Sequence, residues 1–447
     1  MSNRGALAGI RCVAALLGLL LLLAAASACG GKPVAPDEKL DTLIGRQAPK
    51  ETAAADRTVL RIWSFHQGEE FTFWQWLGER YAEENPGVEI KVEYISSDDY
   101  FTGNRLASSF ASGHGPDVFF VSAGTIRKYV NAGILQPLDE YFTAEVRSDF
   151  FKPALDSVTV NDRIYAIPFE TELLGLYYNQ KLFRDQGIAP PETWEQMREA
   201  ARLLKSGSRS GLTVETFGSV YQTFSWLPFL WQTGADLVTE PGDGSGLTEP
   251  GARTMYEFFR GMAEDGLLNM HPSRPTTDIG ILAGGETAMQ VSGSWNIRSL
   301  EASYADQPIG VVPLPVPPGG REVTAAGGWK IGVNRFSAHA DEAARFIAWA
   351  FAESEDIPLK WCTEVKFAYP SRVSVMTAGE ELYDRGLRSV FTSRIFGTER
   401  QEPQLPESVT RIFIDSLNKL VFGDASVDAL LADTNARLNA YFANVQK

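Results

Sequence analysis

Cysteine is nearly absent from this chain. Three cysteines occur in 447 residues, and only Cys362 lies beyond position 30. A single thiol cannot close an internal disulfide, so we expect none in the folded part of the chain. Trp361 and Thr363 on either side favour a buried, structural thiol over a catalytic one. The four histidines have no ligand spacing, and we therefore expect no metal site.

Basic residues are outnumbered and dispersed. The chain has 41 Lys and Arg against 56 Asp and Glu, which gives a formal net charge of −15. Nucleic-acid binding needs a concentrated basic surface that neutralises phosphates, so this composition disfavours it. An acidic balance instead favours solubility.

Recognisable enzyme motifs are missing as well. The chain has no Gly-x-x-x-x-Gly-Lys-Ser/Thr loop, no Gly-x-Ser-x-Gly elbow and no His-Glu-x-x-His pair. The segment 113–115 (Gly-His-Gly) is followed at once by Pro116, which indicates a turn before a strand. Glu170 and Glu172 could in principle cleave a glycoside, but alternation in a strand places them side by side, where they repel. We expect neither catalysis nor a cofactor.

The first 28 residues have the composition of an export signal. Arg4 and Arg11 are the only charged residues before an apolar or small run from Val13 to Ala28. A bilayer core needs about 20 apolar residues, so this run is too short to span it. A basic start, a short apolar stretch and a small-residue exit are typical of a signal peptide, here residues 1–28.

A cysteine directly follows this signal. Ala26, Ser27 and Ala28 before Cys29 resemble the lipobox of bacterial lipoproteins, although that family prefers Leu where this chain has Ala26. The resemblance implies cleavage before Cys29 and a lipid on its thiol. An ordinary signal peptide with an incidental cysteine is the alternative. Residues 29–56 are polar and rich in Pro and Ala, which predicts a flexible tether.

Ordered structure is predicted from about residue 57 onward. Apolar periodicity, alternation and Asn-Pro-Gly punctuation predict a β-α-β-α-β order over 58–63, 73–84, 88–92, 100–112 and 116–121. This order is typical of an α/β fold with a mostly parallel sheet. Ligands gather at the carboxyl ends of such strands, which places 64–70 and 122–124 at the functional edge.

Further elements follow in mixed order. We expect strands at 164–168, 173–179, 288–291 and 310–312, and helices at 193–204, 254–266, 340–353, 408–422 and 427–443.

Tryptophan is well represented, with ten residues. Trp295 follows Ser-Gly-Ser and Trp329 follows Gly-Gly, and the glycines allow close backbone approach. Indole rings stack on the apolar faces of sugars, while carboxylates bind the hydroxyls, so these two positions favour a site for a polar, uncharged ligand. Burial in the core is the preferred interpretation for Trp74, Trp76, Trp194, Trp349 and Trp361.

Six segments occur together in a recognisable order. They contain LRIWSF with ENPGVEIKVEYI; GPDVFFVSAGTIRKYVNAGILQPLDEY; RIYAIPFETELLGLYYNQKLF with PPETWEQMREAARLL; GETAMQVSGSW; IGVVPLPVPPGGREVTAAGGWKIGVN; and AARFIAWAFAESE. Behind a lipobox, this order resembles the extracellular solute-binding lipoproteins of bacterial ABC importers, of the sugar-binding type that includes maltose-binding protein. The resemblance covers residue 58 to the end.

The resemblance implies a set of ligand-facing residues. These are Glu70, Ser122, Glu172, Trp295, Gly327, Gly328, Trp329 and Arg372. Glu172 matches an acidic residue that bonds sugar hydroxyls, and Trp295 matches a stacking aromatic. Some members carry Trp or Asp where this chain has 121–124 (Val-Ser-Ala-Gly), so that contact is lost or replaced by Ser122 and the same sugar does not follow.

The resemblance also implies two α/β lobes with a ligand cleft between them. The first lobe is expected to comprise 57–168 plus 331–366, and the second 171–326 plus 373–447. Crossing segments are expected near 168–172, 325–330 and 366–373.

The implied function is capture without chemistry. A sugar or oligosaccharide binds the open form, hinge closure buries it, and the closed form delivers it to a membrane permease whose ATPase is a separate chain. We expect a monomeric, lipid-anchored protein in the periplasm or on the cell surface. An exported carbohydrate-active enzyme is one alternative. A binding protein for a polyamine, peptide or metal is another, since Glu70, Glu170 and Glu172 could hold a polyamine.

Overall fold

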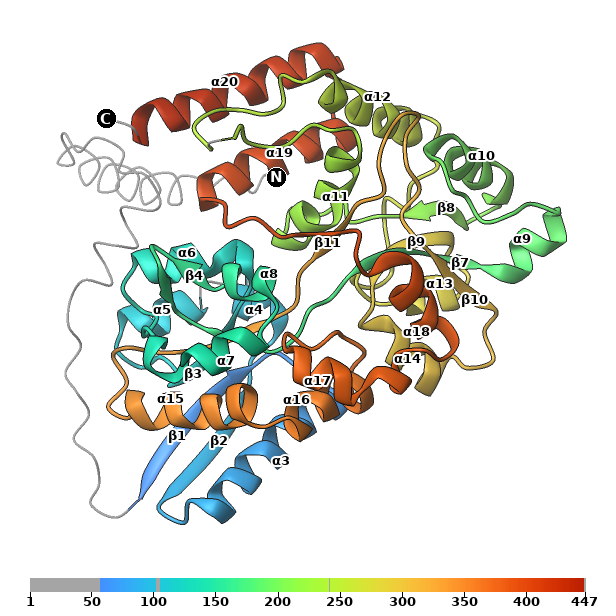
Figure 1. Ribbon diagram of the computed structural model, residues 1–447. Helices are drawn as coiled ribbons and strands as arrows, with labels where there is room; N and C mark the ends of the chain where they lie inside the picture. Colours follow the sequence, from blue (N-terminus) through green and yellow to red (C-terminus); the bar gives the residue numbers. More distant parts are fainter. Residues whose placement is uncertain (1–56, 102–104, 241, 446–447) are drawn as a thin grey trace, which may run out of the picture.

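The computed structural model describes residues 57–101, 105–240 and 242–445. The predicted signal peptide, the tether and Cys29 lie outside these ranges. The described chain forms two lobes, one at the lower left and one at the upper right of Figure 1. Each lobe is built on its own sheet.

The first lobe contains a five-stranded sheet. Its strands are β1 (Thr58–Ser64), β2 (Val88–Tyr94), β3 (Val118–Val121), β6 (Ile167–Pro168) and β12 (Lys330–Val333), in the order β2-β1-β3-β12-β6. Strands β1, β2 and β3 are parallel, and β12 runs antiparallel to β3 and β6. The predicted parallel sheet is therefore present, with an antiparallel strand that arrives from much later in the chain.

Helices cover both faces of this sheet. They are α3 (Gly68–Glu84), α4 (Ser97–Phe101), α5 (Arg105–Ala111), α6 (Ala123–Asn131), α7 (Ala144–Asp149), α8 (Lys152–Asp156), α15 (Ala340–Ala348) and α16 (Asp356–Lys360). A 3₁₀ turn at Asp139–Tyr141 and a hairpin of β4 (Thr159–Val160) and β5 (Arg163–Ile164) complete the lobe.

Several predicted boundaries were wrong, among them those of the strand expected over 164–168, where the structure has the two short strands β5 and β6 instead. Helix α3 begins at Gly68, not at Phe73, so that Glu69 and Glu70 occupy its first turn, where the helix dipole favours acidic groups. Helix α15 ends at Ala348, and Trp349–Glu353 winds as a π-helix. The apolar pattern of the sequence continues from α15 into the π-helix because both segments have buried residues.

The second lobe contains a four-stranded sheet in the order β10-β7-β9-β8. Its strands are β7 (Leu174–Asn179), β8 (Ser210–Thr213), β9 (Thr287–Gly293) and β10 (Ile309–Val312). Strand β9 is antiparallel to β7 and parallel to β8. Strand β8 was not predicted.

The helices of the second lobe come from two separate parts of the chain. They are α9 (Gln180–Gln186), α10 (Trp194–Leu204), α11 (Val220–Gln232), α12 (Pro250–Glu264), α13 (Gly280–Ala283), α14 (Asn296–Ser303), α17 (Val373–Ala378), α18 (Gly386–Val390), α19 (Glu407–Phe422) and α20 (Val427–Val445). The second lobe also contains a 3₁₀ turn at Glu380–Leu382 and a π-helix at Phe391–Ile395. Another π-helix, Trp361–Val365, belongs to the first lobe. Within the described ranges, no helix combines the length and the apolarity that a bilayer crossing requires.

Each lobe has its own apolar core. Trp74, Phe120 and Trp361 are buried in the first, and Trp194 and Trp226 in the second. Trp76 and Trp349, which we expected in the core, are only half-buried. Cys362 is fully buried among the first lobe's apolar residues, as predicted.

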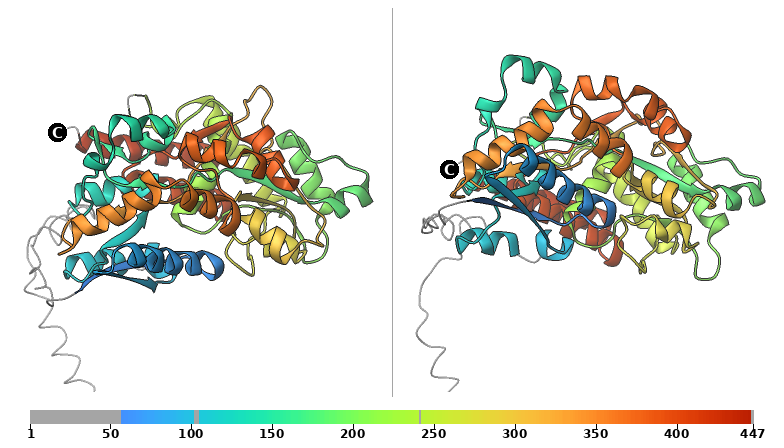
Figure 2. Two further views of the ribbon diagram at one scale, coloured as in Figure 1. Left: turned by 60° about the horizontal axis from the view of Figure 1, so that its bottom comes forward. Right: turned by 90° about the horizontal axis from the view of Figure 1, so that it is seen from below.

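Three segments pass between the lobes side by side. They are 169–173, 327–329 and 366–372. Isolated bridges pair Thr171 with Tyr369 and Leu173 with Ala326. Strand β11 (Thr324–Ala326) leads into the second segment and pairs in parallel with β13 (Glu399–Gln401). The two views in Figure 2 show the blue first-lobe strands and the green helices of the second lobe toward opposite ends of an elongated molecule.

Candidate functional site

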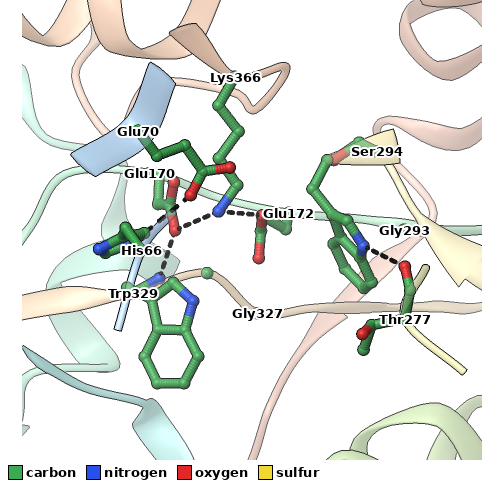
Figure 3. A network of polar contacts seen from close by, with 12 residues as sticks. His66, Glu70, Glu170, Glu172, Thr277, Gly293, Ser294, Gly327, Trp329 and Lys366 are labelled. Atoms are coloured by element: carbon green, nitrogen blue, oxygen red, sulfur yellow. Dashed lines mark hydrogen bonds and ion pairs between the residues drawn. The ribbon is translucent and has the colours of Figure 1, made fainter. Parts of the chain in front are cut away.

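Buried charged groups from two of the crossing segments meet at Lys366. Its Nζ lies 2.7 Å from Glu172 Oε1 and 3.3 Å from Glu170 Oε1 (Figure 3). All three side chains are at most 8% exposed. Lys366 stands in a segment that we predicted to cross between the lobes, but nothing in the sequence pointed to its pairing with Glu170 and Glu172.

Glu170 joins all three crossings. Its Oε1 accepts a hydrogen bond from the Trp329 backbone N–H at 2.9 Å, and its Oε2 accepts one from Trp361 Nε1 at 2.6 Å. Together with the Lys366 contact, these bonds occupy both oxygens of a fully buried carboxylate. Glu170 is thus a structural junction between the crossings. We call Glu170, Glu172 and Lys366 the hinge cluster.

The hinge cluster perturbs the ionisation of its members. Burial raises the pKa of Glu172 to about 7; Lys366 opposes this shift and Glu170 adds to it. Burial disfavours the Lys366 ammonium, yet the carboxylates of Glu170 and Glu172 raise its pKa above the ordinary value. The cluster therefore holds a firmly charged lysine beside a carboxylate that titrates near neutral pH.

Glu70 approaches the hinge cluster from the first turn of α3. Burial raises the pKa of Glu70, with Lys366 opposing and Glu170 adding to the shift. Its Oε2 lies 3.9 Å from His66 Nε2. Burial lowers the pKa of His66 well below its ordinary value, so the ring is neutral at pH 7 and this contact is not an ion pair. His66 was not predicted as a site residue.

Trp329 forms an aromatic wall next to the hinge cluster. Its half-buried ring stacks on Phe101 at 4.9 Å and meets the edge of Phe65 at 4.5 Å. Glycine is required at the two preceding positions because neighbouring atoms come close to their backbone. A Cβ on Gly328, whose φ is +86°, would lie 2.7 Å from the Glu170 carbonyl oxygen, and one on Gly327 would lie 2.6 Å from the Phe224 ring.

Trp295 belongs to the second lobe and directly precedes α14. Its half-buried indole donates from Nε1 to the Thr277 carbonyl at 3.1 Å and meets the edge of Tyr221 at 6.0 Å. The ring lies across the backbone of Gly293, where a Cβ would overlap it. Gly293 thus fixes the position of the ring.

We predict that Gly293→Ala lowers the free energy of unfolding by about 1–3 kcal/mol, because the added methyl group must displace the Trp295 ring. Urea unfolding measures this change. Gly87→Ala is the matched control, because its Cβ would meet no atom within 4 Å and no positive φ restricts it. Equal stabilities of the two variants would contradict the role given to Gly293.

Two residues that we predicted to face the ligand form contacts with other residues of the chain. Arg372 donates from Nε to Asp149 at 2.7 Å and from one terminal nitrogen to the Ser354 carbonyl at 2.5 Å, and no described contact joins it to the hinge cluster. Ser122 caps α6, and its hydroxyl lies 3.3 Å from the Thr125 hydroxyl. The structure therefore brings together Glu70, Glu172, Gly327, Gly328 and Trp329, with Trp295 on the other lobe.

Contacts between the lobes lie on both sides of these residues. Arg298 of α14 pairs with Glu69 of α3 at 3.4 Å, and Lys128 of α6 pairs with Glu407 of α19 at 3.2 Å. Among the residues described, no group of three or more His, Cys, Asp or Glu could hold a metal ion.

Comparison with known proteins assigns this architecture. Residues 67–356, more than half of the chain, match the family model described as bacterial extracellular solute-binding protein. A putative binding protein of Brucella abortus is 23% identical over 369 residues, which cover 80% of this chain and 86% of that protein. The maltotriose-binding protein of Pyrococcus abyssi is 28% identical over 311 residues, 66% of this chain and 63% of that protein.

A solved structure has the same fold. An ABC transporter solute-binding protein from Thermotoga lettingae, bound with α-D-tagatose, superposes with a TM-score of 0.77 at 19% identity, over 86% of this chain and 100% of that one. The predicted α/β fold of two lobes is thereby confirmed as that of the periplasmic binding proteins.

Proposed function

Since the chain belongs to the bacterial extracellular solute-binding protein family, whose members bind solutes and are not enzymes, we propose that it captures a sugar or oligosaccharide for an ABC importer. The single observation that carries this proposal is the presence of two half-buried tryptophans, Trp329 on the second crossing and Trp295 in the second lobe, together with the carboxylates of Glu70 and Glu172. Aromatic faces beside hydrogen-bond acceptors are what a sugar ring requires.

The hinge cluster supports a mechanism of closure. We propose that the lobes comprise 57–168 plus 331–366 and 171–326 plus 373–447, and that they rotate about the crossings joined by Glu170. A ligand shifts this equilibrium only by its difference in affinity for the two forms. Contacts from Glu70 in the first lobe, Trp329 on the second crossing and Trp295 in the second lobe would form together only in the closed form.

The location of the protein is part of the proposal. Members of this family act outside the cytoplasm, and the lipobox-like sequence before Cys29 supports a lipid anchor on the cell surface or in the periplasm. The partner would be the membrane subunits of the importer, and the protein would act as a monomer. Ligand contacts at Ser122 and Arg372 remain predictions.

Thermal unfolding of the purified protein with candidate ligands tests the function. We expect maltose, maltotriose, mannotriose or D-tagatose to raise the unfolding midpoint, since a ligand at 100 times its dissociation constant adds about 2.7 kcal/mol to stability. The sugar should be recovered intact. A shift with spermidine or a peptide alone would overturn the sugar assignment, and cleavage of the sugar would indicate an enzyme.

A further inference from the structure

A carboxylate from the second lobe lies where the sequence suggested Ser122. The place is the N-terminus of α6, at the carboxyl end of β3, where ligands of such sheets gather. The Gly124 backbone N–H donates to the Glu402 carboxylate, and a Cβ on Gly124 would lie only 2.5 Å from Glu402 Oε1. Glycine at 124 thus leaves the space that Glu402 occupies.

Glu402 is held rigidly in this position. Its backbone N–H donates to the Ala326 carbonyl at 2.9 Å, next to the second crossing. Two residues on, the Gln404 amide donates to the carbonyls of Asp156, Ser157 and Thr159 in the first lobe at 3.0, 3.1 and 3.2 Å. The segment that carries Glu402 is therefore bound to both lobes, which preorganises its carboxylate.

A small cavity lies beside this carboxylate. Ser122, Gly124 and Thr125 of the first lobe line it together with Thr223 and Glu402 of the second. Its volume of about 10 Å³ has room for one water or one hydroxyl group.

Thr223 is an independent sign that this cavity receives a polar group. The residue is 5% exposed, and its hydroxyl has no hydrogen-bond partner among the described residues. A buried hydroxyl without a partner is unfavourable, so a group that binds it in the cavity would be favoured.

We propose that Glu402 is a specificity-determining residue of the ligand site, and that the cavity receives one sugar hydroxyl. This hydroxyl donates its hydrogen to the Glu402 carboxylate, and its oxygen accepts one from the Thr223 hydroxyl. Both of these groups belong to the second lobe, and Ser122, Gly124 and Thr125 of the first lobe supply the facing wall. The inference rests on the proposed sugar function and adds a third carboxylate to Glu70 and Glu172.

The first test is Gly124→Ala. Alanine favours the helix that contains position 124, whereas its methyl group would displace Glu402. We expect affinity for the best-binding sugar of maltose, maltotriose, mannotriose and D-tagatose to fall at least tenfold in calorimetry, without loss of thermal stability. Unchanged affinity would overturn the proposal.

The second test separates recognition from a merely structural role. Monodeoxy derivatives of that sugar are titrated into the wild type and into Glu402→Ala. One derivative should bind the wild type at least tenfold more weakly than the parent sugar, and this discrimination should fall below about threefold in Glu402→Ala. If Glu402→Ala weakens the binding of every derivative by the same factor, Glu402 only stabilises the closed form.

Glu407→Gln is the matched control. Glu407 lies on the same segment and also pairs across the lobes, with Lys128, but it does not line this cavity. It should leave the deoxy-sugar discrimination unchanged, and loss of that discrimination here would overturn the assignment to Glu402. If no sugar of the panel binds the wild type, the proposed function fails and this inference with it. If sugars bind but Glu402→Ala discriminates as the wild type does, only the inference fails.

Discussion

Replacing Lys366 with methionine should lower the free energy of unfolding by about 3–5 kcal/mol. The substitution leaves the carboxylates of Glu170 and Glu172 buried without their cation, and breaking a buried ion pair from one side costs about this much. Methionine keeps the length and the apolar stem of the side chain. The loss of stability is therefore caused by removal of the charge and not by a cavity. Urea unfolding at pH 7 measures it.

A neighbouring lysine provides the matched control. Lys360 pairs with Glu364 at 2.6 Å on the same stretch of chain, but both side chains are well exposed. Exposed pairs contribute about 0–1 kcal/mol, so Lys360→Met should change stability by no more than this. Similar losses in the two variants would contradict the role of Lys366 in the hinge cluster.

The loss at Lys366 should also depend on pH. Burial raises the pKa of Glu172 from 4.5 to about 7, and removing Lys366, which lowers it, raises it further. A carboxyl whose folded pKa is raised stabilises the fold fully below its unfolded pKa, and this contribution is lost as pH rises through the folded value. The variant should therefore lose less stability at pH 5 than at pH 8. An equal loss at both would show that Glu172 does not titrate in this range.

Local patterns predicted the fold well where an element is a short apolar run or has one polar face. Strands β1 and β3 and helices α10 and α12 were expected from alternation, apolar runs and amphipathic spacing. Helix α11 was missed because it is buried on nearly every side and therefore has no polar stripe, and because Pro228 within it is typical of a helix break.

The site could be predicted only in part, because its geometry depends on distant segments. Glu170 and Glu172 were interpreted as a pair that repels, whereas Lys366 from the third crossing compensates both. Glycines before Trp329 pointed to close approach, which the structure shows at the Glu170 carbonyl. Glu402 could not be predicted as a site residue, since no local sequence pattern indicates that it lies next to the start of α6.

Trp295→Ala should weaken binding of the best-binding sugar of the panel by about 10- to 100-fold. Aromatic side chains at the centre of a site contribute about 2 kcal/mol or more to binding, and tenfold in affinity corresponds to 1.4 kcal/mol. The indole is already half-buried by Thr277 and Tyr221, so it is held in place before the ligand arrives. Isothermal titration calorimetry measures the loss.

The control for Trp295 is a tryptophan of similar exposure outside the site. Trp349 is also half-buried, but its ring packs on Tyr81 and Phe346 and its Nε1 donates to Glu84 on the outer side of the first lobe. Trp349→Ala should reduce thermal stability and leave affinity within about threefold. If Trp295→Ala keeps wild-type affinity while remaining folded, the ligand does not stack on the second lobe. The cleft would then recognise its ligand through Trp329 and the carboxylates alone.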